Sequence, residues 1–392
     1  MIEFKNLDVV FGKQVDQALP LLDSGVSRNE ILEKTGCTAG VRNANLKVEQ
    51  GEICVLMGLS GSGKSSLLRT ANGLNPITRG SVHLDTENGM QDFNSLSEAE
   101  QRQVRMERIT MVFQKFALMP WLTVAQNVAF GLEQKGMDKK LIREKVEEQL
   151  ELVGLTPWAD KKPSELSGGM QQRVGLARAL AMETDIILMD EPFSALDPLI
   201  RAQLQDELLR LQAKLNKTVV FVSHDLDEAL KLGNHIAIMK DGEIVQHDTP
   251  ENIVLNPAND YVRDFVAHTN PVDVVKGHSL MRSLSSLEQE GEEYCLSHRH
   301  DYWLELKSGI DSARVRLGDQ FYPVHKWDGE GSIETLPKQP AMVPVETIMK
   351  DIMELRYHTG HGVLLHKNDK VVGYVGDKDI YHALLGKLLD ED

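Results

Sequence analysis

Cysteine and long apolar stretches are both scarce in this sequence. Its 392 residues include three cysteines, Cys37, Cys54 and Cys295, and their spacing matches no metal-binding motif. We therefore expect packed, free thiols, as in proteins of a reducing cytosol. No run of about 18 apolar residues occurs, so the chain is not predicted to cross a bilayer. Its first residues lack the basic and apolar regions of a signal peptide.

An excess of positive charge is also missing. The chain has 43 Lys and Arg residues against 59 Asp and Glu, a net charge of −16. Binding to nucleic acid or anionic lipid depends on clustered cations that release counterions, so this composition argues against a general affinity for either, and it leaves room only for a local basic groove. The hydrophobic share of 41% and the charged share of 26% are ordinary for a globular protein, and the length suits two or three domains.

The distribution of apolar segments indicates an α/β fold. Several short segments are apolar throughout instead of alternating, and helical segments separate them, which predicts a parallel sheet covered on both faces. These strand segments are residues 52–57, 109–114, 185–190 and 218–225. A helical subdomain is expected at about residues 115–166.

The N-terminal part adds two strand-like segments with a helical insert between them. The strands are expected at residues 2–11 and 40–48. In the insert, Ser27 and Glu30 have the spacing of a capping box, and Gly36 suits the C-terminal end of the helix.

A hairpin and a change of pattern mark the end of the first domain. Residues 235–250 predict two strands joined by a turn at Asp241-Gly242. Near residue 270 the pattern becomes less regular and richer in histidine. We therefore predict one domain at 1–270 and a smaller one at 271–392.

Residues 58–65 read GLSGSGKS and match the pattern of a phosphate-binding loop. An apolar strand precedes the loop and a helix follows it, as the motif requires. Its glycines let backbone N–H groups converge on a phosphate, Lys64 can reach the β- and γ-phosphates, and the Ser65 hydroxyl can bind Mg²⁺. The expected phosphate-binding residues are Gly58, Ser60, Gly61, Ser62, Gly63, Lys64, Ser65 and Ser66.

Polar residues at other strand ends complete a candidate hydrolytic site. Asp190 ends an apolar strand, where it can hold Mg²⁺, and Glu191 follows as a candidate to orient or deprotonate water. The amide of Gln114 could touch both Mg²⁺ and the water. His224 could contact a γ-phosphate. A solvent-facing Gln114 and a structural His224 are the alternatives.

A second glycine-containing loop precedes the helical stretch MQQRVGLARALAM. Ser167, Gly168 and Gly169 would present backbone N–H groups and a helix N-terminus to an anion. If two chains met head to tail, each could offer this loop to the other's nucleotide. An ordinary capped helix explains the same residues, so both interpretations stay open.

These motifs occur in the order found in the ATP-binding-cassette (ABC) ATPases. The segments GLSGSGKSS, LSGGMQQR, ILMDEP, SALD and SHD, together with Gln114, resemble that family over about residues 1–268, and LSGGMQ is its own signature. The resemblance implies a P-loop cassette with a mixed sheet and a helical subdomain. It also implies ATP and Mg²⁺ as cofactors and a homodimer that hydrolyses ATP.

The resemblance assigns roles to single residues. It implies Mg²⁺ ligation by Ser65, Gln114 and Asp190. It implies three catalytic residues: Glu191 orients the water, His224 is the switch at the γ-phosphate, and Gln114 couples the nucleotide to the permease-facing region.

Two further sets of contacts follow from the same resemblance. The loop that closes on the partner subunit's ATP would contain Ser167, Gly168, Gly169 and Gln171. Phe11 resembles the aromatic residue that stacks on adenine, although the helical insert places it unusually far before Gly58.

Three segments narrow the branch of the family. Residues 17–41, 113–124 and 190–215 resemble the ATPase subunits of quaternary-amine uptake transporters for glycine betaine, choline or proline-like solutes, the choline type being nearest. The resemblance implies an integral-membrane permease and, indirectly, a periplasmic or surface substrate-binding protein, with no nucleic-acid partner. The expected location is peripheral, on the cytoplasmic face of the inner membrane. Residues 116–121 either form subdomain core or a groove for a permease helix.

The C-terminal segment reads helix, strand, polar turn, strand, helix. At about residues 343–389 it resembles one cystathionine-β-synthase-type (CBS) repeat, so a smaller α+β domain is expected, in which Asp379 matches a ribose-contacting position. No first copy is recognisable at residues 272–340, and a folded appendix that steadies the dimer is the alternative. Most of the thirteen histidines lie in this tail and are expected at the surface.

Other functions agree less well with these residues. A soluble ABC-type ATPase of translation or DNA maintenance would usually carry two cassettes or a long coiled coil, and neither is present. A phosphotransferase with a phosphate loop would leave the Ser-Gly-Gly signature and His224 unexplained.

Overall fold

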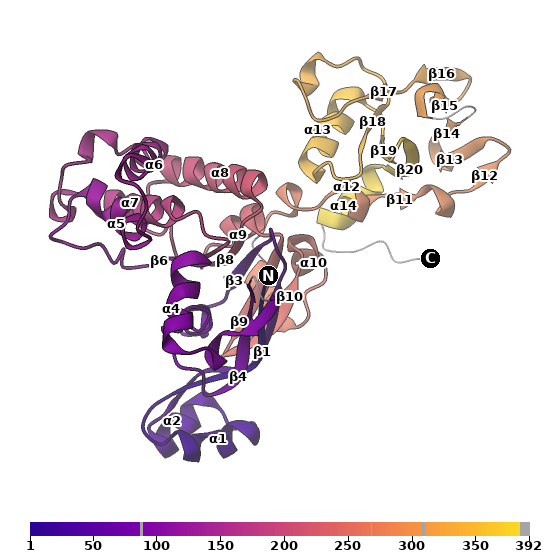
Figure 1. Ribbon diagram of the computed structural model, residues 1–392. Helices are drawn as coiled ribbons and strands as arrows, with labels where there is room; N and C mark the ends of the chain where they lie inside the picture. Colours follow the sequence, from indigo (N-terminus) through magenta and orange to yellow (C-terminus); the bar gives the residue numbers. More distant parts are fainter. Residues whose placement is uncertain (87–88, 268, 307–309, 385–392) are drawn as a thin grey trace. The chain divides into compact units, whose positions relative to one another are not determined.

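The computed structural model describes residues 1–86, 89–267, 269–306 and 310–384. The chain forms two compact units (Figure 1). The first contains Met1–Ile253 and Ala258–Val262, and the second contains Val254–Pro257 and the chain from Arg263 onward. The division thus comes shortly before residue 270, where the sequence pattern changes. Residues 385–389 of the expected CBS-like segment lie outside the described residues.

The larger sheet of the first unit is mixed and has the order β10-β9-β3-β8-β7-β6. Its strands are β3 (Ile53–Met57), β6 (Ile109–Val112), β7 (Ile186–Asp190), β8 (Thr218–Val222), β9 (His235–Lys240) and β10 (Glu243–Asp248). All neighbouring pairs from β9 to β6 are parallel, and β10 is antiparallel to β9. Every residue of β3, β7 and β8 is buried, which confirms the prediction from their continuous apolar pattern.

A second, antiparallel sheet has the order β2-β1-β4-β5. Its strands are β1 (Ile2–Phe11), β2 (Thr38–Val48), β4 (Arg79–Thr86) and β5 (Gly89–Asp92). The first two confirm the expected strands, whereas β4 and β5 were not predicted. One buried apolar cluster includes Phe4 of β1, Leu56 of β3 and Leu188 of β7, so the two sheets share a core.

The predicted insert consists of two helices, α1 (Val15–Asp23) and α2 (Arg28–Thr35). Ser27 accepts a hydrogen bond from the Glu30 amide at 3.3 Å, and Gly36 ends α2 with a φ of +64°. The guanidinium of Arg28 donates to the carbonyl of Gly61 at 2.6 Å. The insert is therefore tied directly to the phosphate-binding loop.

The hairpin of β9 and β10 turns at the predicted residues. Asp241 and Gly242 both have positive φ, at +51° and +91°, as a tight hairpin turn requires.

Helices surround the sheets of the first unit (Figure 1). They are α3 (Lys64–Leu68), α4 (Glu98–Glu107), α5 (Val124–Gln134), α6 (Lys139–Leu152), α7 (Gly168–Ala181), α8 (Pro198–Leu215), α9 (Leu226–Leu232), α10 (Pro250–Leu255) and α11 (Asp260–Val266), the last two lying at the division between the units. Helices α5, α6 and α7 pack together as the helical subdomain. No helix of the described residues has the length and apolar character needed to cross a membrane.

Residues 115–122 form a loop, so the prediction of helix from residue 115 was wrong for this segment. Phe116 and Ala117 have positive φ values of +56° and +48°, which a right-handed α-helix does not allow. The buried side chain of Asn127 holds the loop, because it accepts from the Met119 amide at 2.8 Å and donates to the Met119 carbonyl at 3.2 Å.

The second unit contains two five-stranded sheets, ordered β11-β20-β19-β18-β17 and β12-β13-β14-β15-β16. The strands are β11 (Arg282–Ser283), β12 (Gln289–Glu290), β13 (Glu293–Ser297), β14 (Tyr302–Glu305), β15 (Arg314–Leu317), β16 (Gln320–Pro323), β17 (His325–Lys326), β18 (Ala341–Pro344), β19 (Val363–Lys367) and β20 (Lys370–Val375). The helices are α12 (Gly277–Leu280), α13 (Met349–Thr359) and α14 (Asp377–Leu384). The order α13, β19, turn, β20, α14 matches the expected order of elements, whereas the sheet of residues 289–323 was not predicted.

Candidate functional site

The phosphate-binding loop leads from β3 into α3. Its glycines allow conformations and close approaches that other residues resist: Gly58 and Gly63 have φ values of +138° and +106°. A Cβ at Gly63 would stand 2.3 Å from the carbonyl oxygen of Gly40, so a larger residue would clash there. The hydroxyl of Ser62 is buried and without a partner among the described residues, which is the state expected of a group awaiting a ligand.

Lys64 lies inside the same loop. Its side chain is 7% exposed, and its amine donates to the carbonyls of Gly58 at 2.7 Å and Leu59 at 3.1 Å. Burial lowers the pKa of this amine, while the charges of Glu191 and Asp190 oppose that shift. The cation is thus held at the loop's centre, where it can turn toward an entering phosphate.

Asp190 ends β7 at the same edge of the sheet. Its carboxylate is fully buried and accepts from the Ser65 hydroxyl at 2.7 Å and from the Arg69 guanidinium at 2.8 Å. The structure therefore brings the expected metal ligands Ser65 and Asp190 into contact. A hydroxyl and a carboxylate are hard oxygen donors, which fits Mg²⁺.

Glu191 is the next residue and has a positive φ of +50°. Its Oε2 atom accepts from the Gln114 amide at 3.0 Å and lies 3.5 Å from Nδ1 of His224. A cavity of about 40 Å³ beside Glu191 and His224 has room for a water molecule. The three predicted catalytic residues, Glu191, Gln114 and His224, thus meet at one point.

The signature loop caps α7. Ser167 accepts from the Met170 amide at 3.4 Å, and Gln171 donates to the carbonyls of Pro163 and Leu166 at 3.0 and 3.2 Å. A Cβ at Gly168 would have nothing within 4 Å, whereas one at Gly169 would stand 3.0 Å from the Ala195 carbonyl oxygen. The open space at Gly168 shows that its own chain does not require a glycine there.

Phe11 lies at the end of β1 and is 37% exposed. Its ring would stand 2.6 Å from a Cβ at Gly40, and Gly40 in turn adjoins Gly63 of the phosphate loop. Although the insert separates Phe11 from Gly58 in sequence, the pairing of β1 with β2 places Phe11 near the phosphate loop.

Sequence reasoning missed three residues that support the site. Arg69 lies one helical turn after Ser65 and pairs with Asp190, and that four-residue spacing is the signal that could have revealed it. Gln172 donates to the Glu191 carbonyl at 3.0 Å and accepts from the Ala195 amide at 3.0 Å. Arg28 holds Gly61, but its sequence distance from the loop carries no signal.

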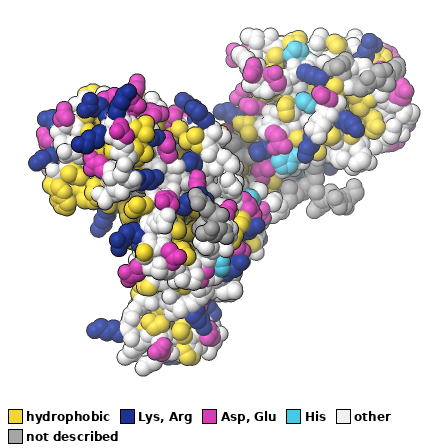
Figure 2. Space-filling view, in the orientation of Figure 1, with side chains coloured by type: hydrophobic (Ala, Val, Ile, Leu, Met, Phe, Trp, Pro, Cys, Tyr) yellow, Lys and Arg dark blue, Asp and Glu magenta, His cyan; other side chains and the backbone are white. Residues whose placement is uncertain are grey.

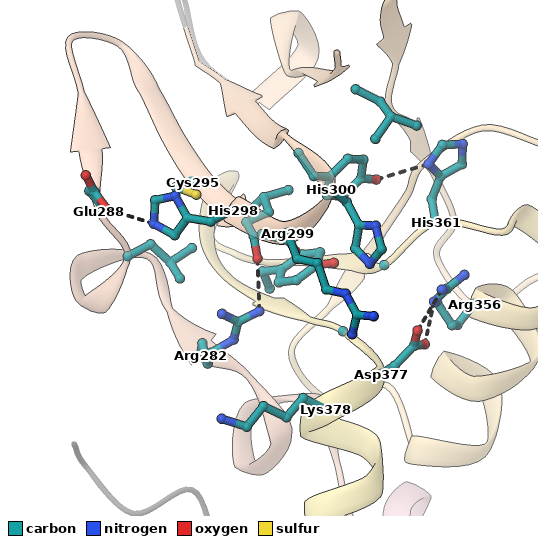
Figure 3. Close-up of a pocket in the computed structure, with 18 of the residues that line it drawn as sticks. Arg282, Glu288, Cys295, His298, Arg299, His300, Arg356, His361, Asp377 and Lys378 are labelled. Carbon is teal, nitrogen blue, oxygen red and sulfur yellow. Dashed lines mark hydrogen bonds and ion pairs between the residues drawn. The ribbon is translucent and has the colours of Figure 1, made fainter.

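The second unit contains a cavity of about 1010 Å³ (Figure 3). Its walls carry the cationic residues Arg282, Arg299, Arg356 and Lys378 and the histidines His298, His300, His361 and His382. Arg356 donates to both oxygens of Asp377 at 2.8 and 2.9 Å, and His298 lies 2.8 Å from Glu288. The side chains of Arg299 and Lys378 have no hydrogen bond or ion pair within the described ranges, and Figure 3 shows Arg299 projecting into the cavity.

Two expectations for this unit can be set beside the structure. Asp379, matched to a ribose-contacting position, is not among the residues that line the cavity, and that match stays a prediction. Its carboxylate is buried, accepts from the Gly376 amide at 2.7 Å and pairs with Arg282 at 3.2 Å. Burial raises the pKa of this carboxyl, while the Gly376 amide and Arg282 act against that shift. His361 is not simply a surface residue, because it is half-buried and contacts the Tyr302 hydroxyl at 3.1 Å.

The first unit therefore joins a phosphate loop, a buried metal-type carboxylate, a glutamate with a space for water, and a glycine-led helix N-terminus. This combination defines a nucleotide-hydrolysing cassette.

Comparisons with known proteins agree with this definition. A family model described as "ABC transporter" matches residues 41–194. The chain is 50% identical over 405 residues to the glycine betaine/proline betaine transport system ATP-binding protein ProV of Escherichia coli (strain K12), covering 98% of this chain and 97% of that protein. It is 42% identical over 358 residues to the glycine betaine transport ATP-binding protein OpuAA of Bacillus subtilis (strain 168), covering 90% and 85%.

Among solved structures, one is titled the dimeric structure of a post-hydrolysis state of the ATP-binding cassette MJ0796 bound to ADP and Pi. It is 33% identical to this chain with a TM-score of 0.55, and the match covers 64% of this chain and 99% of that one. The chain belongs to the ABC ATPases, in the family of ATP-binding subunits of quaternary-amine transport systems. The relatives support this function over a role in translation or DNA maintenance.

Proposed function

We propose that two copies of this ATPase subunit power the import of a quaternary-amine osmolyte through a membrane permease. The observation that carries the proposal is the meeting of Glu191, Gln114 and His224 beside the phosphate loop. The signature helix α7 stands apart from this loop and is available for the nucleotide of a second subunit. The relatives' names speak of glycine betaine and proline betaine, which favours a betaine-type solute. Choline, the nearest type by sequence resemblance, is the competing solute.

Magnesium is the metal we propose at Ser65 and Asp190. The ion would supply charge neutralisation for the β- and γ-phosphates. Gln114 is the third proposed ligand, and its contact with Glu191 would link the ion to the water-handling group. Gly58, the serines and glycines up to Ser66, and Lys64 would cradle the phosphates, with Phe11 against the adenine.

A homodimer completes the proposed site. Ser167, Gly168, Gly169 and Gln171 would approach the partner subunit's ATP, with the helix N-terminus and its free N–H groups facing the γ-phosphate. The open space at Gly168 supports this: no contact within its own chain requires a glycine there, so the missing side chain leaves room for a ligand from outside. Within the described residues, no hydrogen bond or ion pair joins this loop to the phosphate loop of its own chain.

The segment after Gln114 is the proposed permease-docking surface. Trp121 is 69% exposed, and Figure 2 shows hydrophobic side chains gathered on the helical subdomain. Arg178 donates to the carbonyls of Ala117 and Phe116 at 2.8 and 3.1 Å and so fixes the loop that joins Gln114 to Trp121. A permease helix that moved this loop would move a neighbour of Glu191. The subunit would then lie on the cytoplasmic face of the membrane.

An uptake assay tests the transport function. Cells expressing the subunit with its genomic permease and binding protein should accumulate labelled glycine betaine, and competition with unlabelled choline would rank the two solutes. Glu191→Gln in the same cells should abolish uptake. Accumulation of neither solute, with intact ATP hydrolysis, would contradict the quaternary-amine assignment.

The second unit is proposed to be a CBS-like regulatory module, with its cavity as a sensor of anionic solutes. Unpaired Arg299 and Lys378 give the cavity cationic groups that an anion or a nucleotide phosphate could neutralise. Such contacts weaken with rising salt, so the same groups could report ionic strength.

The double variant Arg299→Gln/Lys378→Gln tests this role in the reconstituted transporter. We expect it to flatten the dependence of ATP hydrolysis on salt and to leave hydrolysis at low salt within about twofold, because neither residue belongs to the ATP site. Lys350→Gln, a change at an exposed lysine of α13, is the matched control. An unchanged salt response in the double variant would leave the unit as a scaffold.

A further inference from the structure

Three side chains of the types that commonly bind metal ions, each from a separate segment, meet at one end of the central sheet. Glu52 directly precedes β3, His235 begins β9, and His247 lies on β10. One donor atom from each lies within 4.8 Å of the other two. Strand pairing produces this meeting, because β3 and β9 run side by side from this end and the hairpin returns β10 to it.

An ion pair explains only two of these residues. Glu52 is 7% exposed; one carboxylate oxygen contacts Nδ1 of His235, and the other accepts from the Glu49 amide at 2.7 Å. The ring of His247 stands 5.3 Å from that of His235, where two protonated imidazoles would repel one another. Burial and the neighbouring His235 lower the pKa of His247, which favours the neutral form that binds metals.

We propose that Glu52, His235 and His247 bind a divalent transition-metal ion of the zinc class, with water in the fourth position. Two imidazoles and one carboxylate are a known ligand set for such ions, whereas Mg²⁺ and Ca²⁺ prefer oxygen alone. With bonds of about 2.0–2.1 Å in a tetrahedral site, donor atoms lie roughly 3.4 Å apart. Because the donor atoms lie within 4.8 Å of one another, each pair would need to close by at most about 1.4 Å to reach that value.

Cys54 lies next to this group but is assigned no ligand role. Its Sγ atom is 3.9 Å from Nε2 of His247. Burial, with a smaller contribution from the charge of Glu52, raises the pKa of the Cys54 thiol, so the sulfur keeps its proton. The neighbours of His247 desolvate part of its ring, but the residue as a whole is exposed, which gives water access to the open position.

The site is separate from the ATP site. Glu52 and Gly58 lie at opposite ends of β3, and five strand residues span roughly 17 Å. The ion would join three segments of the sheet that carries the phosphate loop. Its first effect is therefore expected on stability, and the inference goes beyond the transport function.

Metal titration of the tag-free, chelator-treated full chain tests the proposal. We expect one Zn²⁺ per chain by calorimetry in the presence of excess Mg²⁺, and a rise in melting temperature of about 5 °C or more at 100 times the dissociation constant. His235→Gln and His247→Gln should each weaken Zn²⁺ binding at least ~10-fold. His83→Gln, on β4 of the other sheet, is the control and should bind as the wild type does. Equal binding by all variants, or no stoichiometric binding, would overturn the site.

Cobalt substitution tests the ligand set. Co²⁺ bound to Glu52, His235 and His247 should give visible bands without a thiolate charge-transfer band, and Cys54→Ser should leave the spectrum unchanged. A thiolate band that disappears in Cys54→Ser would overturn the three-ligand assignment. Glu52→Gln keeps the side-chain shape and an oxygen for the Glu49 amide but loses the charge that faces His235. A melting temperature of the metal-free variant equal to that of the metal-free wild type would separate a loss of Co²⁺ binding from misfolding.

Discussion

Replacing Glu191 with glutamine removes a carboxylate while keeping the shape of the side chain. In the structure Glu191 is held in place mostly by its backbone: its amide donates to the Val222 carbonyl at 3.1 Å, and its carbonyl accepts from Gln172 at 3.0 Å. Those bonds survive the substitution. What disappears is the negative oxygen that faces Gln114 and His224. The variant therefore isolates the base function from the geometry.

The expected loss in ATP turnover is ~10²- to 10⁴-fold, the usual contribution of a positioned general base. This corresponds to about 2.7 to 5.4 kcal/mol in the activation free energy. ATP binding should persist, because the hydrogen bonds of Lys64 and Ser65 go to Gly58, Leu59 and Asp190, and the charge of Asp190 still favours the Lys64 cation. With hydrolysis blocked, the proposed closed dimer should accumulate.

Single-turnover hydrolysis and size-exclusion chromatography with ATP and Mg²⁺ measure the two effects. Glu148→Gln, at an exposed position on α6, makes the same chemical change away from the site and should behave as the wild type does. Turnover of Glu191→Gln within threefold of the wild type would refute the assignment of the base. A variant that loses turnover yet stays monomeric with bound ATP would refute the shared site instead.

Three further changes test separate parts of the proposal. Lys64→Ala should weaken ATP binding by ~10- to 100-fold, because a charge-assisted contact to phosphate is lost. Titration with a fluorescent ATP analogue measures the affinity, and an unchanged affinity would count against a phosphate-binding role for Lys64. Gly168→Asp should leave the melting temperature unchanged, because a Cβ there meets nothing within 4 Å and an acidic residue suits a helix N-terminus. It should reduce ATP turnover by ~100-fold, because the new negative charge would face the γ-phosphate bound by the partner subunit. Normal turnover would contradict the shared site. Thr123→Ala should lower the free energy of unfolding by about 1 kcal/mol in chemical denaturation, because the Thr123 hydroxyl caps α5, and Thr123→Ser should restore it; equal loss in both variants would assign the effect to packing.

The parts of the fold that the sequence predicted are those with local signals. Continuous apolar segments marked the buried strands β3, β7 and β8, and the Asp241-Gly242 pair marked the hairpin. Strands β4 and β5 were missed because their pattern is mixed and their stability depends on strand pairing. β4 pairs with β1, which lies far away in the sequence, and β5 pairs with β4. The loop at residues 115–122 was read as helix, since nothing local reveals that Asn127 holds it open.

The candidate site divides in the same way. Lys64, Ser65, Asp190 and Glu191 stand in motifs whose spacing reflects backbone geometry, so their positions could be predicted. Arg28 and Gln172 act through contacts across long sequence distances and leave no pattern. The meeting of Glu52, His235 and His247 is likewise visible only once β3, β9 and β10 are paired.

The contacts of Asp190 show how a buried carboxylate proposed to bind Mg²⁺ can be stabilised when no ion is bound. Ser65 and the cation of Arg69 already satisfy both of its oxygens, so the carboxylate is never left bare inside the protein. If Mg²⁺ binds here as proposed, it would compete with these resident contacts, so its binding would in part exchange one counter-charge for another. A guanidinium displaced in that exchange has a route to solvent, because the Arg69 side chain is 39% exposed.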